Sequence, residues 1–349
     1  MKKVTRKIKK TAVVCALLAA LAALGSCGDP GGGRREPIRK TEFLLDTICT
    51  VTVFSRGDEK HATEALALCA GYEKLLSSAV PDSEISKING AGGAPVTVSD
   101  GTAALLERAV YYGTLSDGAF DVTIGRVSSL WDFSSDSDTH PVPEAADIEA
   151  ALPSADYRNI ELAGNVVRLK DPAARLDLGG IAKGFIADRM AEYLTESGVR
   201  AALIDLGGNI VTVGGKESGA PWTIGVRNPA PQTADGRSEV IVGTIEVEGT
   251  MSVGTSGTYE RFFMRDGLRY HHILDPKTGF PVRTDLAGVT VVTEKSVDGD
   301  GIATICVLYG SERARDFLRR NNIPAVLVKE DGAVIAVGGV KYTPAGGKG

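Results

Sequence analysis

Short runs of apolar and β-branched residues, joined by glycine-containing turns, fill the second half of the sequence and constrain its fold most strongly. We expect strands at 201–205, 209–213, 222–227, 240–247, 250–254, 261–264, 269–274 and 287–293. Strands joined by short turns favour a mixed or antiparallel sheet, because parallel pairs need long crossovers. Helices must then pack on that sheet to bury its apolar face. The sequence therefore predicts an α+β fold.

Apolar spacing places the helices and the remaining strands. Helices are expected at 59–77, at 99–116 with Ser99 and Asp100 as its start, and at 181–196, 300–309 and 311–321. Further strands are expected at 43–54, 324–328 and 333–337, with a strand pair in 160–177 divided by Asp171-Pro172 and a surface loop at 133–145. Neither a repeat nor a change in composition interrupts 40–343, so a single domain is predicted at 42–343.

The first 27 residues are typical of an exported lipoprotein. Residues 1–10 hold six lysines and arginines and no acid, an apolar run fills 11–24, and Leu24-Gly25-Ser26-Cys27 follows. Because the run is shorter than the roughly 20 residues that span a bilayer, 1–26 is predicted to be a secretory signal peptide. The final four residues resemble a bacterial lipobox, which predicts lipidation of Cys27. The alternative is an ordinary signal peptide with a coincidental cysteine.

Residues 27–41 would then form a flexible, glycine-rich tether. We expect the protein to be lipid-anchored at the cell membrane, facing the periplasm or the cell exterior.

Charge and cysteine content argue against several classes of function. The formal net charge is −5, and it becomes more negative once the basic signal peptide is removed. Because nucleic-acid phosphates require Lys and Arg, no nucleic acid is expected as a partner. Cys49, Cys69 and Cys306 are widely spaced in apolar stretches, which indicates small buried residues rather than a disulfide framework or a zinc site.

Four segments place small residues beside carboxylates at the ends of elements: 115–133, 176–188, 254–263 and 296–310. In 176–188, a strand ending near Asp177 runs through Gly179-Gly180 into a helix that carries Lys183 in its first turn. Glycines let a ligand approach the backbone, and Lys183 could reach a phosphate or a ring carbonyl. The spacing fits neither a Walker loop nor a dinucleotide-binding motif, so an ordinary strand-to-helix turn remains the simpler explanation of this segment alone.

The segment 296–310 brings three oxygen-bearing side chains close together. Asp300 and Thr304 are four residues apart, so a helix puts both on one face, and Asp298 adds a third oxygen nearby. Carboxylate and hydroxyl oxygens suit a hard cation such as Mg²⁺. The alternative is that an aspartate caps the helix and Thr304 packs in the core.

Two adjacent histidines stand in 270-YHHILDPKTGFPV-282. Strand alternation would point His271 and His272 to opposite faces, so one could enter a site while the other faces solvent or neighbouring strands. Imidazole titrates near neutral pH and can accept a hydroxyl proton. Two half-buried structural histidines are the alternative.

Together these segments resemble a known family, the bacterial FAD:protein FMN transferases or ApbE-like flavin transferases. The resemblance covers about residues 42–340 and extends to the lipoprotein signal. Its motifs are Leu45-Asp46-Thr47, Asp82-Ser83-Glu84-Ile85-Ser86, Gly118-Ala119-Phe120-Asp121, 176-LDLGGIAKG-184, His272-Ile273-Leu274-Asp275-Pro276-Lys277-Thr278-Gly279 and Asp300-Gly301-Ile302-Ala303-Thr304. Each motif alone is weak, but several in one order are specific.

The resemblance implies a Mg²⁺-dependent enzyme that transfers the FMN half of FAD to a Thr or Ser hydroxyl of an acceptor protein and releases AMP. It places the metal ligands at Asp300, Thr304 and a backbone oxygen of Gly180. It makes His272 the catalytic residue and His271 a bystander. Contacts to FAD fall on Leu45, Ala119, Phe120, Asp121, Asp177, Lys183 and Leu274. The acceptor would be an exported redox-complex subunit with a Ser/Thr flavinylation motif.

The sequence departs from the family pattern at two positions and leaves two other functions open. Leu45 stands where members often carry Met, and Ala79 stands where they often carry an aromatic residue that touches the flavin. An FAD pyrophosphatase that yields FMN and AMP would use the same fold and metal. A non-catalytic FAD-binding lipoprotein is the third reading, although simple binding of FAD needs no metal.

Overall fold

The computed structural model describes residues 36–54, 59–133, 140–229 and 240–346. The predicted signal peptide and the lipidation site Cys27 lie outside these residues. Contacts group Pro37–Gly349 into one unit, and the architecture below is that of this unit. Within the described residues, no helix is long and apolar enough to cross a membrane.

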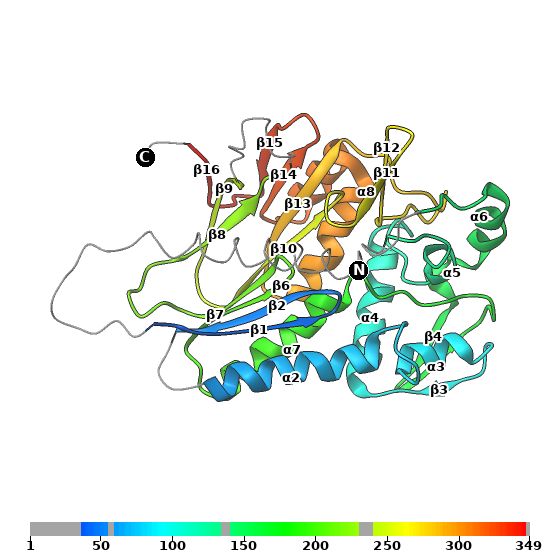
Figure 1. Ribbon diagram of the computed structural model, residues 1–349, viewed down its shortest axis with the longest axis horizontal. Coiled ribbons are helices and arrows are strands. Elements are labelled where there is room, and N and C mark those ends of the chain that lie inside the picture. Colours follow the sequence, from blue (N-terminus) through cyan, green and yellow to red (C-terminus); the bar gives the residue numbers. More distant parts are fainter. Residues whose placement is uncertain (1–35, 55–58, 134–139, 230–239, 347–349) are drawn as a thin grey trace, which may run out of the picture. The chain divides into compact units, whose positions relative to one another are not determined.

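An eight-stranded antiparallel sheet forms the centre of the unit (Figure 1). Every neighbouring pair in it is antiparallel, as short connections between strands favour. In order across the sheet the strands are β1 (Ile38–Leu44), β2 (Thr47–Val53), β6 (Ala201–Leu206), β7 (Asn209–Gly214), β10 (Met251–Gly257), β13 (Leu286–Thr293), β14 (Ala325–Lys329) and β15 (Val334–Val337).

Both faces of this sheet are buried. Helices α2 (Glu59–Leu76), α7 (Ala182–Glu196) and α8 (Ser296–Arg320) cover one face, where Ile204 of β6 and Leu327 of β14 join the main core. A smaller sheet of β8 (Trp222–Arg227), β9 (Ile241–Val247) and β16 (Tyr342–Pro344) covers the other, where Val326 packs in a separate core. Successive strand residues therefore enter different cores, as the two-residue period requires. The predicted α+β fold is confirmed.

The remaining elements lie beside α8 and carry several of the sequence motifs. They are α3 (Glu84–Gly90), α4 (Asp100–Leu115), α5 (Gly125–Ser128), α6 (Ala145–Ala151), the sheet of β3 (Val96–Thr97), β5 (Val166–Leu169) and β4 (Ile160–Ala163), and the hairpin of β11 (Phe262–Arg265) and β12 (Leu268–His271). Ser99 caps α4 by accepting a hydrogen bond from Thr102 N at 3.3 Å, as the sequence predicts.

Several predicted boundaries were wrong. The strand expected at 43–54 is the β1–β2 hairpin, so 38–41, assigned above to the tether, belong to a strand. Leu45 and Asp46 form its turn with φ values of 55° each, a left-handed pair that two-residue hairpins require but that non-glycine residues seldom adopt. The strand pair in 160–177 turns at Gly164 rather than at Asp171-Pro172.

Helix α8 contains the two helices expected at 300–309 and 311–321. It begins earlier than expected, at Ser296, and it is interrupted at Gly310, whose φ of 74° and ψ of 167° are not helical. The break falls on the residue between the two predicted helices, and glycine alone adopts that conformation without strain.

Candidate active site

The junction of α7 and α8 is the most closely packed contact between the predicted motifs. A Cβ on Gly184 would lie 2.2 Å from the carbonyl oxygen of Ser296, so only glycine allows the two helices to approach this closely. Asp188 joins the same two helices, because its carboxylate accepts hydrogen bonds from Ser296 N at 2.7 Å and Val297 N at 3.0 Å. Asp188 of α7 therefore caps α8, a role that the sequence analysis gave to Asp298 or Asp300.

Asp300 is buried at this junction, with only 6% of its surface exposed. Gly184 N donates to Oδ2 at 2.6 Å and Asn209 Nδ2 donates to Oδ1 at 2.9 Å. Burial raises the pKa of the Asp300 carboxyl to about 6, although Lys183 and the Gly184 N–H favour the charged form. Both donors are neutral, so the carboxylate oxygens keep electron pairs for a cation.

Thr304 and Gly180 lie beside one another next to this carboxylate. Thr304 is one turn after Asp300 on α8, and its Oγ1 lies 3.1 Å from Oγ of Ser256 on β10. A Cβ on Gly180 would lie 3.9 Å from Thr304 Cγ2 and 3.1 Å from Cε2 of Phe120. Because Gly184 N bonds to Asp300, it does not donate back to Gly180, whose carbonyl stays outside the helical ladder. The structure thus brings the three predicted metal ligands together.

Asp298 does not belong to this set. Its Oδ1 pairs with the guanidinium of Arg108 and accepts from Tyr112 Oη at 2.5 Å, both on α4. The expectation that Asp298 adds a third oxygen is therefore wrong, because residues two apart on a helix point to different sides. Among the described residues, no group of three or more His, Cys, Asp or Glu side chains could hold a metal ion. The predicted set needs none, since it combines one carboxylate, one hydroxyl and one carbonyl.

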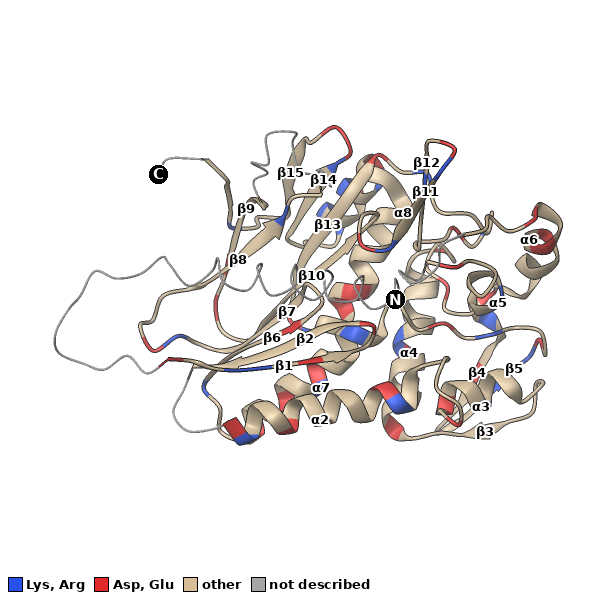
Figure 2. Cartoon of the chain, viewed as in Figure 1, with Lys and Arg blue, Asp and Glu red and all other residues tan. Residues whose placement is uncertain are grey.

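Two cations stand at the junction without an ion-pair partner. Within the described residues, the side chains of Lys183 and Arg261 make neither a hydrogen bond nor an ion pair. Lys183 acts electrostatically on Asp300, Glu260 and Asp205. Figure 2 shows both basic (blue) and acidic (red) segments on the helices that cover one face of the large sheet. The side chains of both Lys183 and Arg261 therefore have donors that no described residue of the chain accepts.

His271 and His272 have different environments. His271 is 5% exposed, its Nε2 donates to the carbonyl of Val282 at 3.1 Å, and its Nδ1 accepts from Ile273 N at 3.3 Å. Burial lowers its pKa to about 4. The ring therefore supports the loop between β12 and Val282, and the role of His271 as a bystander in the reaction stays a prediction.

His272 is partly exposed, and its backbone N–H donates to the carbonyl of Arg261 at 3.1 Å. The same carbonyl lies 3.3 Å from its Nδ1, and since a carbonyl can only accept, Nδ1 carries the proton and Nε2 keeps a free electron pair. Burial and the charge of Arg261 lower the pKa of His272 to about 3, so the ring is neutral at neutral pH. A neutral ring with an open Nε2 can accept a proton.

Two of the predicted FAD contacts, Asp121 and Asp177, are carboxylates, and both accept hydrogen bonds from the protein. Asp121 accepts from Thr123 and Tyr157, and burial raises its pKa. Asp177 accepts from Gly179 N at 2.9 Å and Ser128 Oγ at 2.6 Å. Both carboxylates hold the loops that position their neighbours.

The apolar contacts differ in burial. Phe120 and Leu274 are buried, whereas Ala119 and Leu45 are partly exposed. The Leu45 N–H donates to Glu73 of α2 at 2.8 Å, which fixes the β1–β2 turn. Ala79 is exposed.

Sequence reasoning missed four polar residues at the junction: Asp205, Asn209, Glu260 and Arg261. A signal for the first two was present, because Asp-Leu-Gly-Gly occurs at 177–180 and again at 205–208, directly before Asn209. In the second copy, Asp205 accepts from Gly208 N at 2.8 Å, and burial raises its pKa. Glu260 has its pKa raised by burial while Lys183 and Arg261 oppose that shift.

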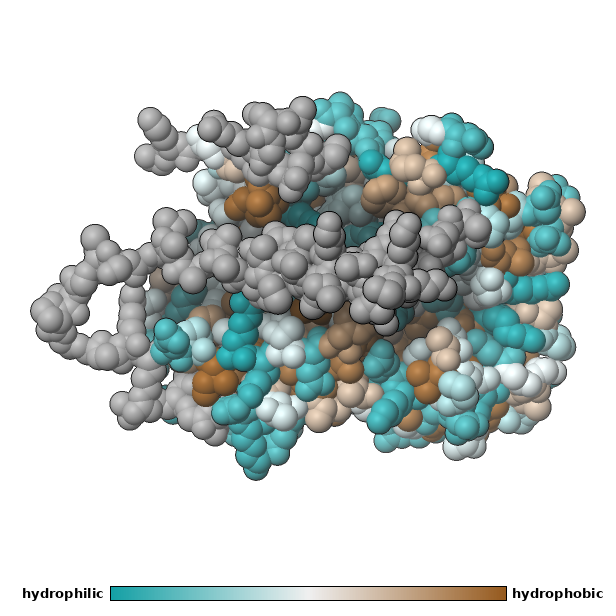
Figure 3. All heavy atoms as spheres, viewed as in Figure 1, coloured by the Kyte–Doolittle hydropathy of each residue, from teal (hydrophilic) through white to brown (hydrophobic). Residues whose placement is uncertain are grey.

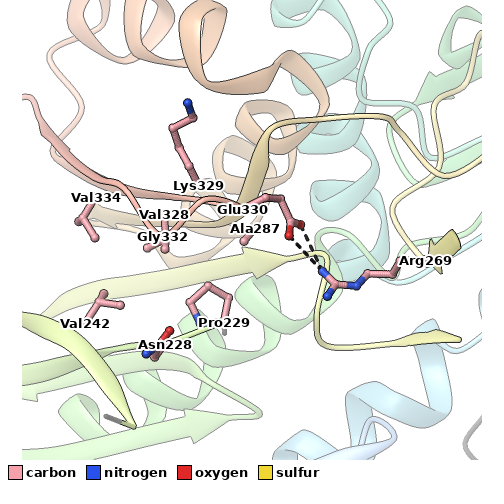
Figure 4. Close-up of a pocket in the computed structure, with 10 residues that line it drawn as sticks. All are labelled: Asn228, Pro229, Val242, Arg269, Ala287, Val328, Lys329, Glu330, Gly332 and Val334. Carbon is pink, nitrogen blue, oxygen red and sulfur yellow. Dashed lines mark hydrogen bonds and ion pairs between the residues drawn. The ribbon is translucent and has the colours of Figure 1, made fainter. Parts of the chain in front are cut away.

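A cavity of about 390 Å³ lies elsewhere, between β9, β13 and the β14–β15 pair (Figure 4). Arg269 stands at its edge and pairs with Glu330, the guanidinium Nη1 being 3.2 Å from Oε1. Lys329 pairs with Asp285 at 3.4 Å. None of the residues predicted from the sequence lines this cavity, and these charges already have partners.

Comparison with known proteins gives consistent matches along the chain. The model of the family described as "ApbE family" matches residues 45–327. The protein named FAD:protein FMN transferase from Treponema pallidum is 37% identical, over 93% of this chain and 92% of its own length. A protein of that name from Klebsiella pneumoniae is 40% identical, over 80% of this chain and 85% of its own. The crystal structure of the ApbE protein from Thermotoga maritima superposes with a TM-score of 0.78 at 30% identity, covering 86% of this chain and 97% of that one.

Proposed function

The chain belongs to the ApbE family, and from that premise we propose that it transfers the FMN half of FAD to a Thr or Ser hydroxyl of an acceptor protein. The observation that carries this proposal is the junction itself. Asp300, Thr304 and Gly180 present oxygens on one side, while Lys183 and His272 stand near them. Simple storage of FAD would need neither a buried carboxylate nor an open imidazole.

The transfer requires one bond to form and one to break. The acceptor hydroxyl oxygen attacks the phosphorus of the FMN half, the bond from that phosphorus to the bridging oxygen breaks, and AMP leaves with the bridging oxygen. The hydroxyl proton passes to Nε2 of His272, which is unprotonated because Nδ1 holds the proton. Lys183 offsets phosphate charge, and the product is a phosphoester between FMN and the acceptor.

The oxygens at the junction fit Mg²⁺. Asp300 receives hydrogen bonds only from neutral donors, Thr304 Oγ1 contacts one hydroxyl, and the Gly180 carbonyl lies outside the helix. This all-oxygen set is the kind that hard cations prefer. Bound there, Mg²⁺ would offset the negative charge of the two phosphates. Asp300, Thr304 and Gly180 would hold it.

We expect the enzyme to act outside the cytoplasmic membrane on an exported redox-complex subunit. The support is the basic and apolar segment before Cys27, together with the glycines that follow. Mass spectrometry of the mature protein should find a lipid-modified Cys27 at the N-terminus, and Cys27→Ser should release soluble protein. A mature chain that begins elsewhere and carries no lipid would refute the anchor.

The decisive experiment uses FAD, Mg²⁺ and an exported subunit that carries a Ser/Thr flavinylation motif. In-gel flavin fluorescence measures transfer, and chromatography measures AMP. Flavin on the acceptor together with an equal amount of AMP supports the transferase. AMP and free FMN without labelled acceptor would instead support the pyrophosphatase, and bound FAD without AMP would support a non-catalytic binder. A Thr/Ser→Ala acceptor is the control.

A further inference from the structure

Arg261, beside the β11–β12 hairpin, is an arginine to which the sequence motifs gave no role. Arg261 comes directly before β11 and His272 directly after β12, and the Arg261 carbonyl accepts from both the N–H and the Nδ1–H of His272. These two hydrogen bonds hold the backbone of Arg261 next to His272. The Arg261 side chain therefore starts from a point beside the proposed proton acceptor.

The guanidinium of Arg261 extends over the glycine turn that begins α7. A Cβ on Gly179 would lie 4.0 Å from Nη2 of Arg261. Gly180, the next residue, is adjacent to Thr304. The positive charge of Arg261 acts to lower the pKa of Glu260 and also that of His272. The cation thus lies between the proton acceptor and the turn that holds a predicted metal ligand.

The other arginines of this hairpin are occupied. Arg265 Nη1 donates to the carbonyl of His140 at 3.4 Å, and Arg269 pairs with Glu330 at 3.2 Å. Arg261 is exposed, and its side chain makes neither a hydrogen bond nor an ion pair with the residues that the structure describes. A planar guanidinium presents donors in a fork that matches two oxygens of a phosphate.

We propose that Arg261 binds the phosphate of the FMN half of FAD, the phosphate that the acceptor hydroxyl attacks. This inference rests on the proposed function, because it places the guanidinium beside the phosphorus that His272 must serve. Proton acceptor and attacked phosphorus must share one neighbourhood, and the hydrogen bonds from His272 to the Arg261 carbonyl hold the backbone of Arg261 there, with Nη2 4.0 Å from a Cβ on Gly179. Lys183, in the first turn of the helix that follows the same glycines, supplies the second positive charge.

Equilibrium binding without acceptor tests the inference separately from transfer. FAD, FMN, riboflavin and AMP are titrated against the whole mature protein in the presence of Mg²⁺, using flavin fluorescence for the flavins and calorimetry for AMP. Arg261→Gln should weaken FAD and FMN on the order of tenfold to a hundredfold, since a charge-assisted hydrogen bond is lost. Riboflavin and AMP, which lack this phosphate, should bind as before.

Two further variants make the comparison specific. Arg265→Gln removes a neighbouring exposed arginine and should leave binding of all four compounds unchanged. Arg261→Lys keeps the charge without the fork and should fall between the wild type and Arg261→Gln. Thermal unfolding of the two Arg261 variants should match that of the wild type, because the Arg261 side chain makes no hydrogen bond or ion pair with the described residues.

Three outcomes would overturn the proposal: unchanged FMN affinity in Arg261→Gln, equal loss for riboflavin and FMN, or loss confined to FAD and AMP. The last would place Arg261 on the adenosine side. A different outcome would separate the two proposals. If Arg261→Gln weakens the binding of FAD and FMN as expected, but the wild type transfers no flavin to the acceptor, the proposed transfer is wrong and the phosphate contact is still supported.

Discussion

Two arginines and two histidines on or beside the β11–β12 hairpin have opposite environments. At the α7–α8 junction, His272 keeps an open Nε2 and Arg261 has no side-chain partner among the described residues. Arg269, at the edge of the cavity of Figure 4, pairs with Glu330. His271 does not line that cavity, and both of its ring nitrogens bond to the backbone.

The two regions differ in whether their charged groups have partners. At the cavity of Figure 4, Arg269 pairs with Glu330 and Lys329 pairs with Asp285. The junction holds a buried carboxylate and two cations whose partners are missing from the described chain. Charged groups that lack partners disfavour the folded state. We therefore expect a bound ligand to interact with these groups.

Removing the carboxylate should distinguish the regions most strongly. Asp300→Asn should abolish transfer, a loss of about a thousandfold or more, because a metal ion contributes several kcal/mol to the transition state. Replacing a carboxylate on the surface would leave the stability of the fold unchanged. Asp300 is buried and receives two hydrogen bonds, so its replacement should also lower that stability. Asparagine keeps the shape and can still accept one of these two hydrogen bonds, whereas alanine would leave both Gly184 N–H and Asn209 Nδ2 without this partner.

Steady-state transfer and Mg²⁺ calorimetry check this prediction. The matched control is Asp188→Asn, which removes the other buried aspartate of the junction, the cap of α8. It should lower the unfolding temperature without selective loss of Mg²⁺ binding. Normal Mg²⁺ affinity in Asp300→Asn would show that the metal site is elsewhere.

Truncating the open histidine should have the next largest effect. His272→Ala should lower the transfer rate by roughly two to four orders of magnitude at saturating FAD and acceptor, because the general base is lost. FAD affinity should change far less, since most predicted contacts lie elsewhere. If the rate falls only a few-fold, the hydroxyl needs no imidazole.

The buried histidine should affect stability instead of chemistry. His271→Ala should cost about 1–3 kcal/mol of unfolding free energy, because Ile273 N and the Val282 carbonyl lose their partner inside the protein. Denaturant unfolding measures the cost, and the transfer rate per folded molecule should stay within a few-fold of the wild type. A larger loss of rate for His271→Ala than for His272→Ala would reverse the assignment.

The pH dependence of stability sharpens the same comparison. The folded-state pKa of His271 is about 4, below the ordinary value of 6.5, so the unfolded chain takes up the proton first. The contribution of His271 is therefore complete above pH 6.5 and is lost as the pH falls toward 4. The stability difference between wild type and His271→Ala should narrow over this window. A constant difference from pH 7 to pH 4.5 would contradict the lowered pKa.

The smallest effect is expected at the cavity. Glu330→Gln should change the free energy of unfolding by no more than about 1 kcal/mol, since the Arg269–Glu330 pair is partly exposed and screened by solvent. Transfer should be unchanged. A strong loss of transfer would show that the cavity region takes part in the reaction. The proposed difference between the two regions would then be wrong.

Figure 3 bears on how the acceptor protein would dock. On the face drawn there, hydrophobic residues form small patches separated by hydrophilic ones. Phe262 and Met264 are exposed and stand two residues apart on β11, so the two-residue period of a strand puts them on one face of the hairpin. A few exposed apolar side chains are ordinary on a protein surface.

The sequence by itself predicted a mixed or antiparallel sheet with helices packed on it, and it put Asp300 and Thr304 on one face of a helix. Gly180 joined these two residues through the family resemblance. Short turns limit strand pairing, helical periodicity puts residues four apart on one face, and several motifs in one order are specific to a family. It did not reveal the β1–β2 turn, because Leu45 and Asp46 adopt φ values that their residue types seldom take.

Only the tertiary structure decided which polar groups are occupied. Asp298 and Asp300 are two residues apart on α8, yet one pairs with Arg108 of α4 and the other is left with neutral donors. Arg261 and Arg269 differ in the same way, as do His271 and His272. The partners of these groups come from strands and helices far away in the sequence. Whether a charge is satisfied or available is therefore a property of packing, which no local pattern encodes.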